Sequence, residues 1–138
     1  MRAAKTADRA ILHDHVALGL AELISGRGGL NYLSDLAKCL GTNADALEGA
    51  IVDLVISQGF VVDGGFGVVK DGLALIYVHP NFRRQHIGTS IYVALAERGP
   101  IELWAKPGDR TAKSFAESLG LKARLLIMSA EQDPNDEG

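Results

Sequence analysis

The chain reads LALIYVHPNFRRQHIGT from residue 73 to residue 89, and this stretch decides the fold. Residues 73–78 are all apolar or aromatic, which is typical of a strand buried on both faces. Pro80 ends that strand, because proline cannot donate a hydrogen bond to a sheet. A helix is predicted to begin at Gln85 or His86 and to run to Glu97. The stretch is therefore a buried strand that leads through a polar loop into a helix.

Strand and helix continue to alternate toward the C-terminus. Gly99 and Pro100 break the helix. The elements predicted after them are a buried strand at 101–105, a turn at 106–109, a helix from Asp109 or Thr111 to Leu119, and a last strand at 121–128. This alternation favours α/β layering with at least one parallel pair of strands.

Helices dominate the chain before residue 70. Apolar residues recur there at helical spacing, and glycines stand where each helix should end. The predicted elements are helices at 8–24, 32–40 and 43–58, followed by strands at 60–62 and 66–69 that a Gly-rich turn joins into a hairpin. Three helices followed by a hairpin is the order of a winged-helix unit.

The chain is accordingly divided into three parts and assigned to a mixed α+β and α/β class. Residues 1–69 form a winged-helix-like helical unit, residues 70–129 a β-α-β-α-β half, and residues 130–138 an acidic, mobile tail.

Composition and charge limit the function classes. The formal charge is −3, and residues 1–69 carry five basic side chains against eight acidic ones. The overall charge therefore provides no electrostatic attraction to nucleic acid. Apolar runs fall short of the roughly 20 residues of a membrane span, and no secretory signal is visible. The single cysteine, Cys39, cannot form an internal disulfide, and its apolar surroundings favour buried packing over reactivity. A cytoplasmic protein without membrane contact is expected.

The helical unit is interpreted as a packing and dimerisation element. Its third helix, which would read DNA in a winged-helix protein, carries Asp45, Glu48 and Asp53 but no Lys or Arg. This composition disfavours DNA binding, which stays as the weakest alternative. The apolar residues of the first helix would contact a second copy or another protein partner. His13 and His15 are two apart on that helix and cannot share a metal, so no metal site is predicted.

The loop after the first buried strand carries the chemistry. Free N–H groups at the start of a helix, together with the positive end of its dipole, bind phosphate oxygens. Gly88 would allow close approach of the backbone, Thr89 adds a hydroxyl, and Arg83 and Arg84 add charge. A diphosphate is the natural ligand of such a loop. The alternative is an ordinary turn between a strand and a helix, with solvated arginines.

Residues of this loop match a known motif. In GNAT-type N-acetyltransferases, Val-x-Pro closes a strand and Gln/Arg-x-x-Gly-x-Gly/Ala follows. Val78, Pro80, Arg83 and Gly88 fit that pattern, so the segment resembles the pyrophosphate loop of the family. His86 stands in place of the first glycine, where the backbone needs a positive φ.

A second resemblance lies at residues 103–121, which look like the strand, turn and helix of the same family. Ala112 and Phe115 match its pattern, Asp109 replaces its usual Asn, and Leu121 replaces its Phe. The resemblance thus covers about the last 60 residues before the tail. It implies that residues 70–129 are a truncated GNAT-like half that binds acyl-coenzyme A.

The resemblance also implies where acetyl-coenzyme A lies. The cofactor would sit between strands centred on Ile76 and Leu103, with its pantetheine amides on the backbone of Ile76 and Val78. Its diphosphate would bind the amides from Arg84 to Thr89. The implied cofactor-binding residues are Ile76, Val78, Arg83, Arg84, Gln85, His86, Ile87, Gly88, Thr89, Asp109 and Phe115.

The implied activity is transfer of an acetyl group to the amine of an unidentified acceptor. The family often uses a tyrosine as the acid toward the departing thiolate, and Ala116 occupies that place here. Tyr77, His79 and Ser114 are the remaining catalytic candidates, although Tyr77 and Trp104 are first expected in the core. The alternative is a catalytically silent half that acts by protein contacts or as a regulator.

Overall fold

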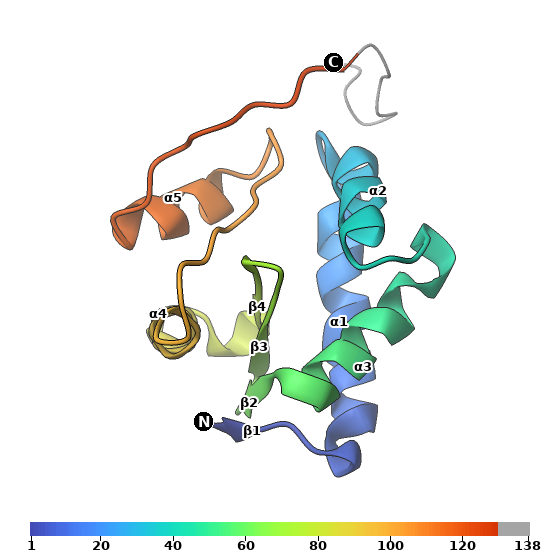
Figure 1. Cartoon of the computed structure of the whole chain (residues 1–138). Helices are drawn as coiled ribbons and strands as arrows, with labels where there is room; N and C mark the ends of the chain where they lie inside the picture. The colour runs from blue at the N-terminus through green and yellow to red at the C-terminus, as the bar shows by residue number, and fades with distance from the viewer. Residues whose placement is uncertain (130–138) are drawn as a thin grey trace.

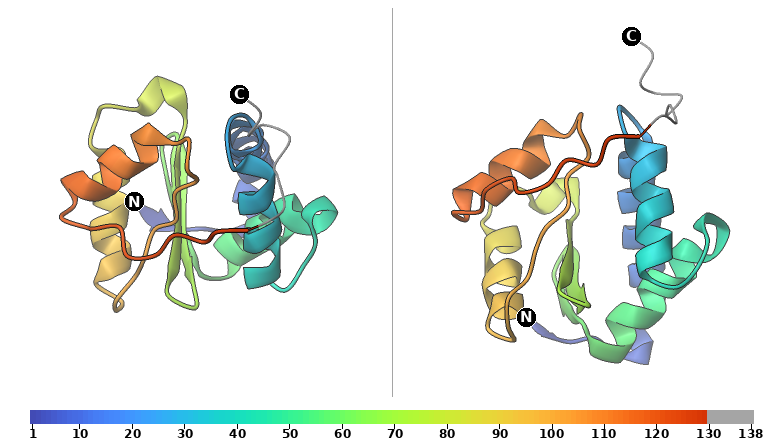
Figure 2. Two further views of the ribbon diagram at one scale, coloured as in Figure 1. Left: turned by 90° about the horizontal axis from the view of Figure 1, so that it is seen from above. Right: turned by 45° about the horizontal axis from the view of Figure 1, so that its top comes forward.

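The computed structural model describes residues 1–129, which form a four-stranded antiparallel sheet between two layers of helices (Figures 1 and 2). The chain is thus a mixed helix-and-sheet fold, as expected. In order, its elements are β1 (Arg2–Ala3), α1 (Arg9–Ile24), α2 (Gly29–Cys39), α3 (Leu47–Gln58), β2 (Phe60–Val62), β3 (Gly65–Lys70), β4 (Leu73–Val78), α4 (Ile87–Ala96) and α5 (Arg110–Ser118). Short 3-10 turns lie at Thr6–Asp8, Ala44–Ala46 and Pro80–Phe82. The predicted mobile tail at 130–138 lies outside the described residues.

The strands follow one another across the sheet in the order β1-β2-β3-β4. The predicted hairpin is confirmed, since β2 and β3 pair from Phe60↔Gly67 to Val62↔Gly65. β1 was not predicted, because two residues carry no periodic signal. It pairs Arg2 with Val61, and the Arg2 guanidinium also binds the Asp8 carboxylate at 2.6 Å.

The strand predicted at 101–105 is wrong in extent. A single parallel pair, Leu73↔Glu102, is all that forms. The Ala74 N–H donates to the Glu102 carbonyl at 2.9 Å, and the Glu102 N–H donates to Gly72 at 2.8 Å. Beyond this pair the chain turns to α1, where Lys106 binds carbonyls at the helix end. The predicted parallel arrangement therefore exists at one point only.

The last strand, predicted at 121–128, is also wrong. Residues 121–129 contain no strand, and they run from the end of α5 toward α2 (Figures 1 and 2). The apolar pattern is real, but a strand also needs an edge to pair with. In the described part of the chain this segment lies away from the sheet and pairs with no strand, although the edge of β4 is open beyond Leu73.

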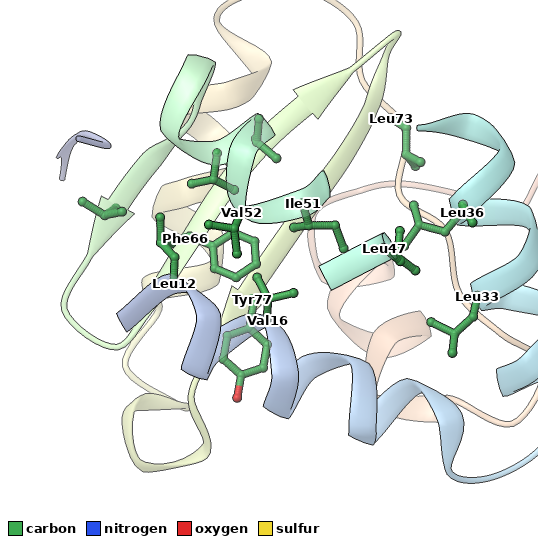
Figure 3. Close-up of a cluster of buried hydrophobic side chains, with 14 residues drawn as sticks. Leu12, Val16, Leu33, Leu36, Leu47, Ile51, Val52, Phe66, Leu73 and Tyr77 are labelled. Atoms are coloured by element: carbon green, nitrogen blue, oxygen red, sulfur yellow. The ribbon is translucent and has the colours of Figure 1, made fainter. Parts of the chain in front are cut away.

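Two hydrophobic clusters lie on opposite faces of the sheet. The larger one joins α1, α2 and α3 to the face that carries Phe66, Val68 and Tyr77 (Figure 3). The smaller one joins Ala74 of β4 to Ile91 and Leu95 of α4. Gly67 allows this second contact, since a Cβ there would overlap Ile91. Both the sheet and the larger cluster continue across residue 69.

None of the helices within residues 1–129 is long and apolar enough to cross a bilayer.

Candidate functional site

The loop before α4 contains left-handed backbone. Two of its residues have positive φ, Arg84 at 66° and His86 at 61°. His86 is the residue immediately before α4 and is left-handed. It therefore takes the conformation expected of the glycine that it replaces.

The amides of this loop from Arg84 onward are not bonded to any acceptor in the part of the chain that the structure describes. The first N–H bonded into α4 is that of Ser90, which donates to the His86 carbonyl at 3.1 Å. Among residues 1–129, no acceptor is found for the amides from Arg84 to Thr89. These donors lie at the positive end of the α4 dipole, and Arg84, Gln85 and His86 are exposed. The arrangement can hold an anion of several oxygens.

Three predicted cofactor residues from three elements meet behind the loop. A Cβ at Gly88 would lie 3.3 Å from the Phe115 ring of α5 and 3.8 Å from Val78 Cγ2 of β4. Gly88 therefore brings the start of α4 close to α5. Its small size serves this packing.

The Arg83 guanidinium is paired within the chain, so its charge is partly neutralised. Its Nη2 donates to both oxygens of Glu22 on α1, at 3.0 and 2.8 Å. Its Nε donates to the Val78 carbonyl at 2.8 Å. The exposed Arg84 is left as the cation of the loop.

The edge of β4 offers free backbone groups at one of the two predicted positions. Ala74 donates outward to Glu102, and the His79 N–H donates inward to Gly64 on the β3 side. Because outward-facing groups alternate along a strand, the N–H and C=O of Ile76 also point to the open edge. The carbonyl of Val78 is taken by Arg83, so Ile76 is the position that remains available.

Two candidates on α5 are not brought to the loop. The Asp109 carboxylate caps its own helix, accepting from the Ala112 N–H at 2.8 Å. Ser114 is exposed on α5, and no bond joins it to the loop in the part of the chain that the structure describes.

Tyr77 lies in a cluster that sequence reasoning did not assemble. Its ring is 5.7 Å from that of His15 and stacks on Phe66 at 5.9 Å, and the Arg83 guanidinium is 6.0 Å from its centre. The hydroxyl is buried, and residues 1–129 offer it no hydrogen-bond partner. Burial, followed by the charge of Glu22, raises the pKa of Tyr77, so the phenol stays protonated.

The two histidines near Tyr77, His15 and His79, have different surroundings. Burial and the neighbouring His79 lower the pKa of His15, which favours its neutral form. His79 Nδ1 accepts a hydrogen bond from the Asn81 N–H at 3.1 Å. The sequence suggested His79 alone. His15 comes close to Tyr77 and His79 only through the packing of α1 on β4.

An open groove of ≈ 1140 Å³ runs past these histidines, between α1 and the β2–β3 turn. Its lining is apolar at Ile11, Leu18, Val62 and Phe82 and carries the carboxylates of Asp14 and Asp63.

Two other residues considered from the sequence, Trp104 and Cys39, pack against neighbouring side chains. Trp104 packs edge-on against Tyr32 at 5.9 Å, and Cys39 is half-buried against the larger cluster, in agreement with packing roles. Within residues 1–129, no three His, Cys, Asp or Glu side chains gather as a metal would require.

Comparison of the chain with protein-family models, with curated proteins and with solved structures finds no match in any of the three.

Proposed function

We propose that this protein binds acetyl-coenzyme A through the loop before α4 and transfers the acetyl group to an amine, as a GNAT-like acetyltransferase. One observation carries the proposal. The amides from Arg84 to Thr89 have no acceptor among the described residues, and two residues of this set, Arg84 and His86, are left-handed just before the start of α4. A diphosphate supplies the oxygens that such a set of donors binds.

The edge of β4 supports the same proposal. The pantetheine arm of coenzyme A carries two amides, which pair with an extended backbone as a strand would. The outward groups of Ile76 are free for this purpose. The single pair between Leu73 and Glu102 leaves the rest of that edge without a neighbouring strand. The arm would therefore lie along β4, with its diphosphate at the loop.

Tyr77 is the residue proposed to protonate the departing thiolate. Its hydroxyl is protonated and buried, and it has no hydrogen-bond partner among the described residues. It can therefore donate its proton to an acceptor supplied by a ligand. Positioning of the two reactants supplies the rest of the rate enhancement, since orientation alone contributes about 7–11 kcal/mol in favourable cases.

Calorimetric titration of the full chain with acetyl-coenzyme A tests the binding step. Arg84→Glu reverses the exposed charge at the loop without changing its backbone demand, because both residues carry a Cβ. We expect this variant to bind at least about tenfold more weakly, which corresponds to about 1.4 kcal/mol. Lys38→Glu makes the same charge change on α2, across the sheet from α4, and should bind like the parent. Equal affinity of the parent and Arg84→Glu, or no binding by either, would refute the loop assignment.

A thiol-release assay against a panel of amines separates the enzyme from a silent coenzyme A binder. Release that depends on the amine, and that Tyr77→Phe slows while leaving affinity for acetyl-coenzyme A intact, is the expected result. Tight binding without release would identify the regulatory alternative instead.

A further inference from the structure

Residues 121–128, here named the C-terminal segment, are an apolar strand sequence without a place in the sheet. Their sequence is LKARLLIM. Leu125, Leu126, Ile127 and Met128 are 75%, 78%, 75% and 87% exposed. Four consecutive apolar side chains in water are characteristic of a surface that another molecule covers.

The groove beside α1 has the complementary character. Its apolar side chains include Ile11 and Leu18, which are 50% and 45% exposed although they lie on a helix that packs on the sheet. Its volume of ≈ 1140 Å³ exceeds the roughly 300–1,000 Å³ of small-molecule pockets. A segment of extended peptide is an occupant of suitable size.

Charge distinguishes the occupant further. The groove carries Asp14 and Asp63, whereas its Arg2 is neutralised by Asp8. The C-terminal segment carries Lys122 and Arg124 and no acidic residue. An apolar, basic peptide therefore fits an apolar, acidic groove.

The segment of the same chain does not reach this groove. It runs to the end of the molecule where α1 gives way to α2 (Figure 1), and Arg124 is tied to Glu102 at 3.0 Å. The groove begins at Met1 and follows the first half of α1. In a second copy the segment is not limited by this distance, and its Arg124 would exchange Glu102 for a carboxylate of the groove.

We propose that two copies of this chain exchange C-terminal segments, each placing residues 121–128 of one copy in the α1 groove of the other. The exchange is reciprocal, so it closes as a two-fold dimer and leaves no free segment. It covers the exposed leucines of both copies and pairs Lys122 and Arg124 with the groove carboxylates. This inference does not depend on the proposed function.

Sedimentation equilibrium of the full chain at micromolar concentrations tests the proposal. A dimer is expected. Leu18→Asp, in the groove, and Ile127→Asp, in the segment, should each weaken dimerisation by at least about tenfold. Val93→Asp is the matched control, because Val93 is an exposed apolar residue of a helix, 52% exposed, outside the groove. It should dimerise like the parent.

A charge exchange distinguishes the groove from other surfaces. Asp14→Lys and Lys122→Glu should each weaken the dimer, and the double variant should recover most of the loss. A monomeric parent, a Val93→Asp variant as weak as Leu18→Asp, or a double variant no better than the singles would each overturn the proposal. All of these substitutions lie at exposed positions, and circular dichroism of each variant checks that its fold is retained.

Discussion

At the scale of single residues, the Tyr77 hydroxyl is the one buried side-chain polar atom without a partner among residues 1–129. Burying a hydroxyl without a hydrogen bond costs free energy. Tyr77→Phe should therefore raise the free energy of unfolding by about 1 kcal/mol, as measured by urea denaturation. A loss of stability of the same size would mean that the hydroxyl is hydrogen-bonded in solution.

A second residue-scale prediction concerns Asp8. The Arg2 guanidinium, and then the Lys5 N–H, lower the pKa of this carboxyl to about 2 from its ordinary 3.8. The charged form is thus favoured by folding, and its contribution to stability is present above about pH 4 and is lost as the pH falls toward 2.

Denaturation of Asp8→Asn across this range provides the measurement. The difference in unfolding free energy between the parent and the variant should shrink steadily as the pH falls through the window. A constant difference would show that the Arg2–Asp8 pair does not contribute to folding.

At the scale of elements, Lys106 connects α1 to the segment after α4. It is buried, at 7% exposure, and its ammonium donates to the carbonyls of Glu22, Leu23 and Ser25. A cation there satisfies the free carbonyls at the end of α1 and complements its dipole. Lys106→Met keeps the length of the side chain but leaves those carbonyls unsatisfied.

We expect Lys106→Met to lower the free energy of unfolding by roughly 2–3 kcal/mol and to speed amide exchange in the last turn of α1. Lys113→Met is the control, because Lys113 is exposed and makes only a 3.4 Å contact with the Pro107 carbonyl. The control should stay within about 0.5 kcal/mol of the parent. Equal effects of the two substitutions would contradict the capping role.

Elements with a strong local pattern could be predicted, and elements that depend on a partner could not. The apolar spacing within α1 and the glycine after α3 place those helices to within a few residues. β1 is a strand only because β2 lies beside it. Residues 121–128 have a strand pattern but pair with no strand among the described residues, so the local signal alone was misleading.

At the scale of the whole molecule, the candidate site was predicted in part. Gly88 and Phe115 do meet, and Ile76 does face the open edge of β4. The sequence alone predicts Arg83 as a free cation. Nothing in the local sequence indicates its ion pair with Glu22, which lies 61 residues away. In the same way Tyr77 rests on Gly19, whose added Cβ would lie 3.0 Å from its ring, and only the packed helix reveals this. Contacts between distant residues are what the sequence pattern leaves undetermined.

The single backbone pair between Leu73 and Glu102 determines how tightly the segment after α4 is held beside β4. A full strand beside β4 would fix the spacing of the two segments along their length, whereas a single pair fixes it at one point. Ligands of different width beside β4 would then strain the sheet to a similar, small extent. Under the proposed function, discrimination between short and long acyl chains would then depend on the side chains that line the edge of β4.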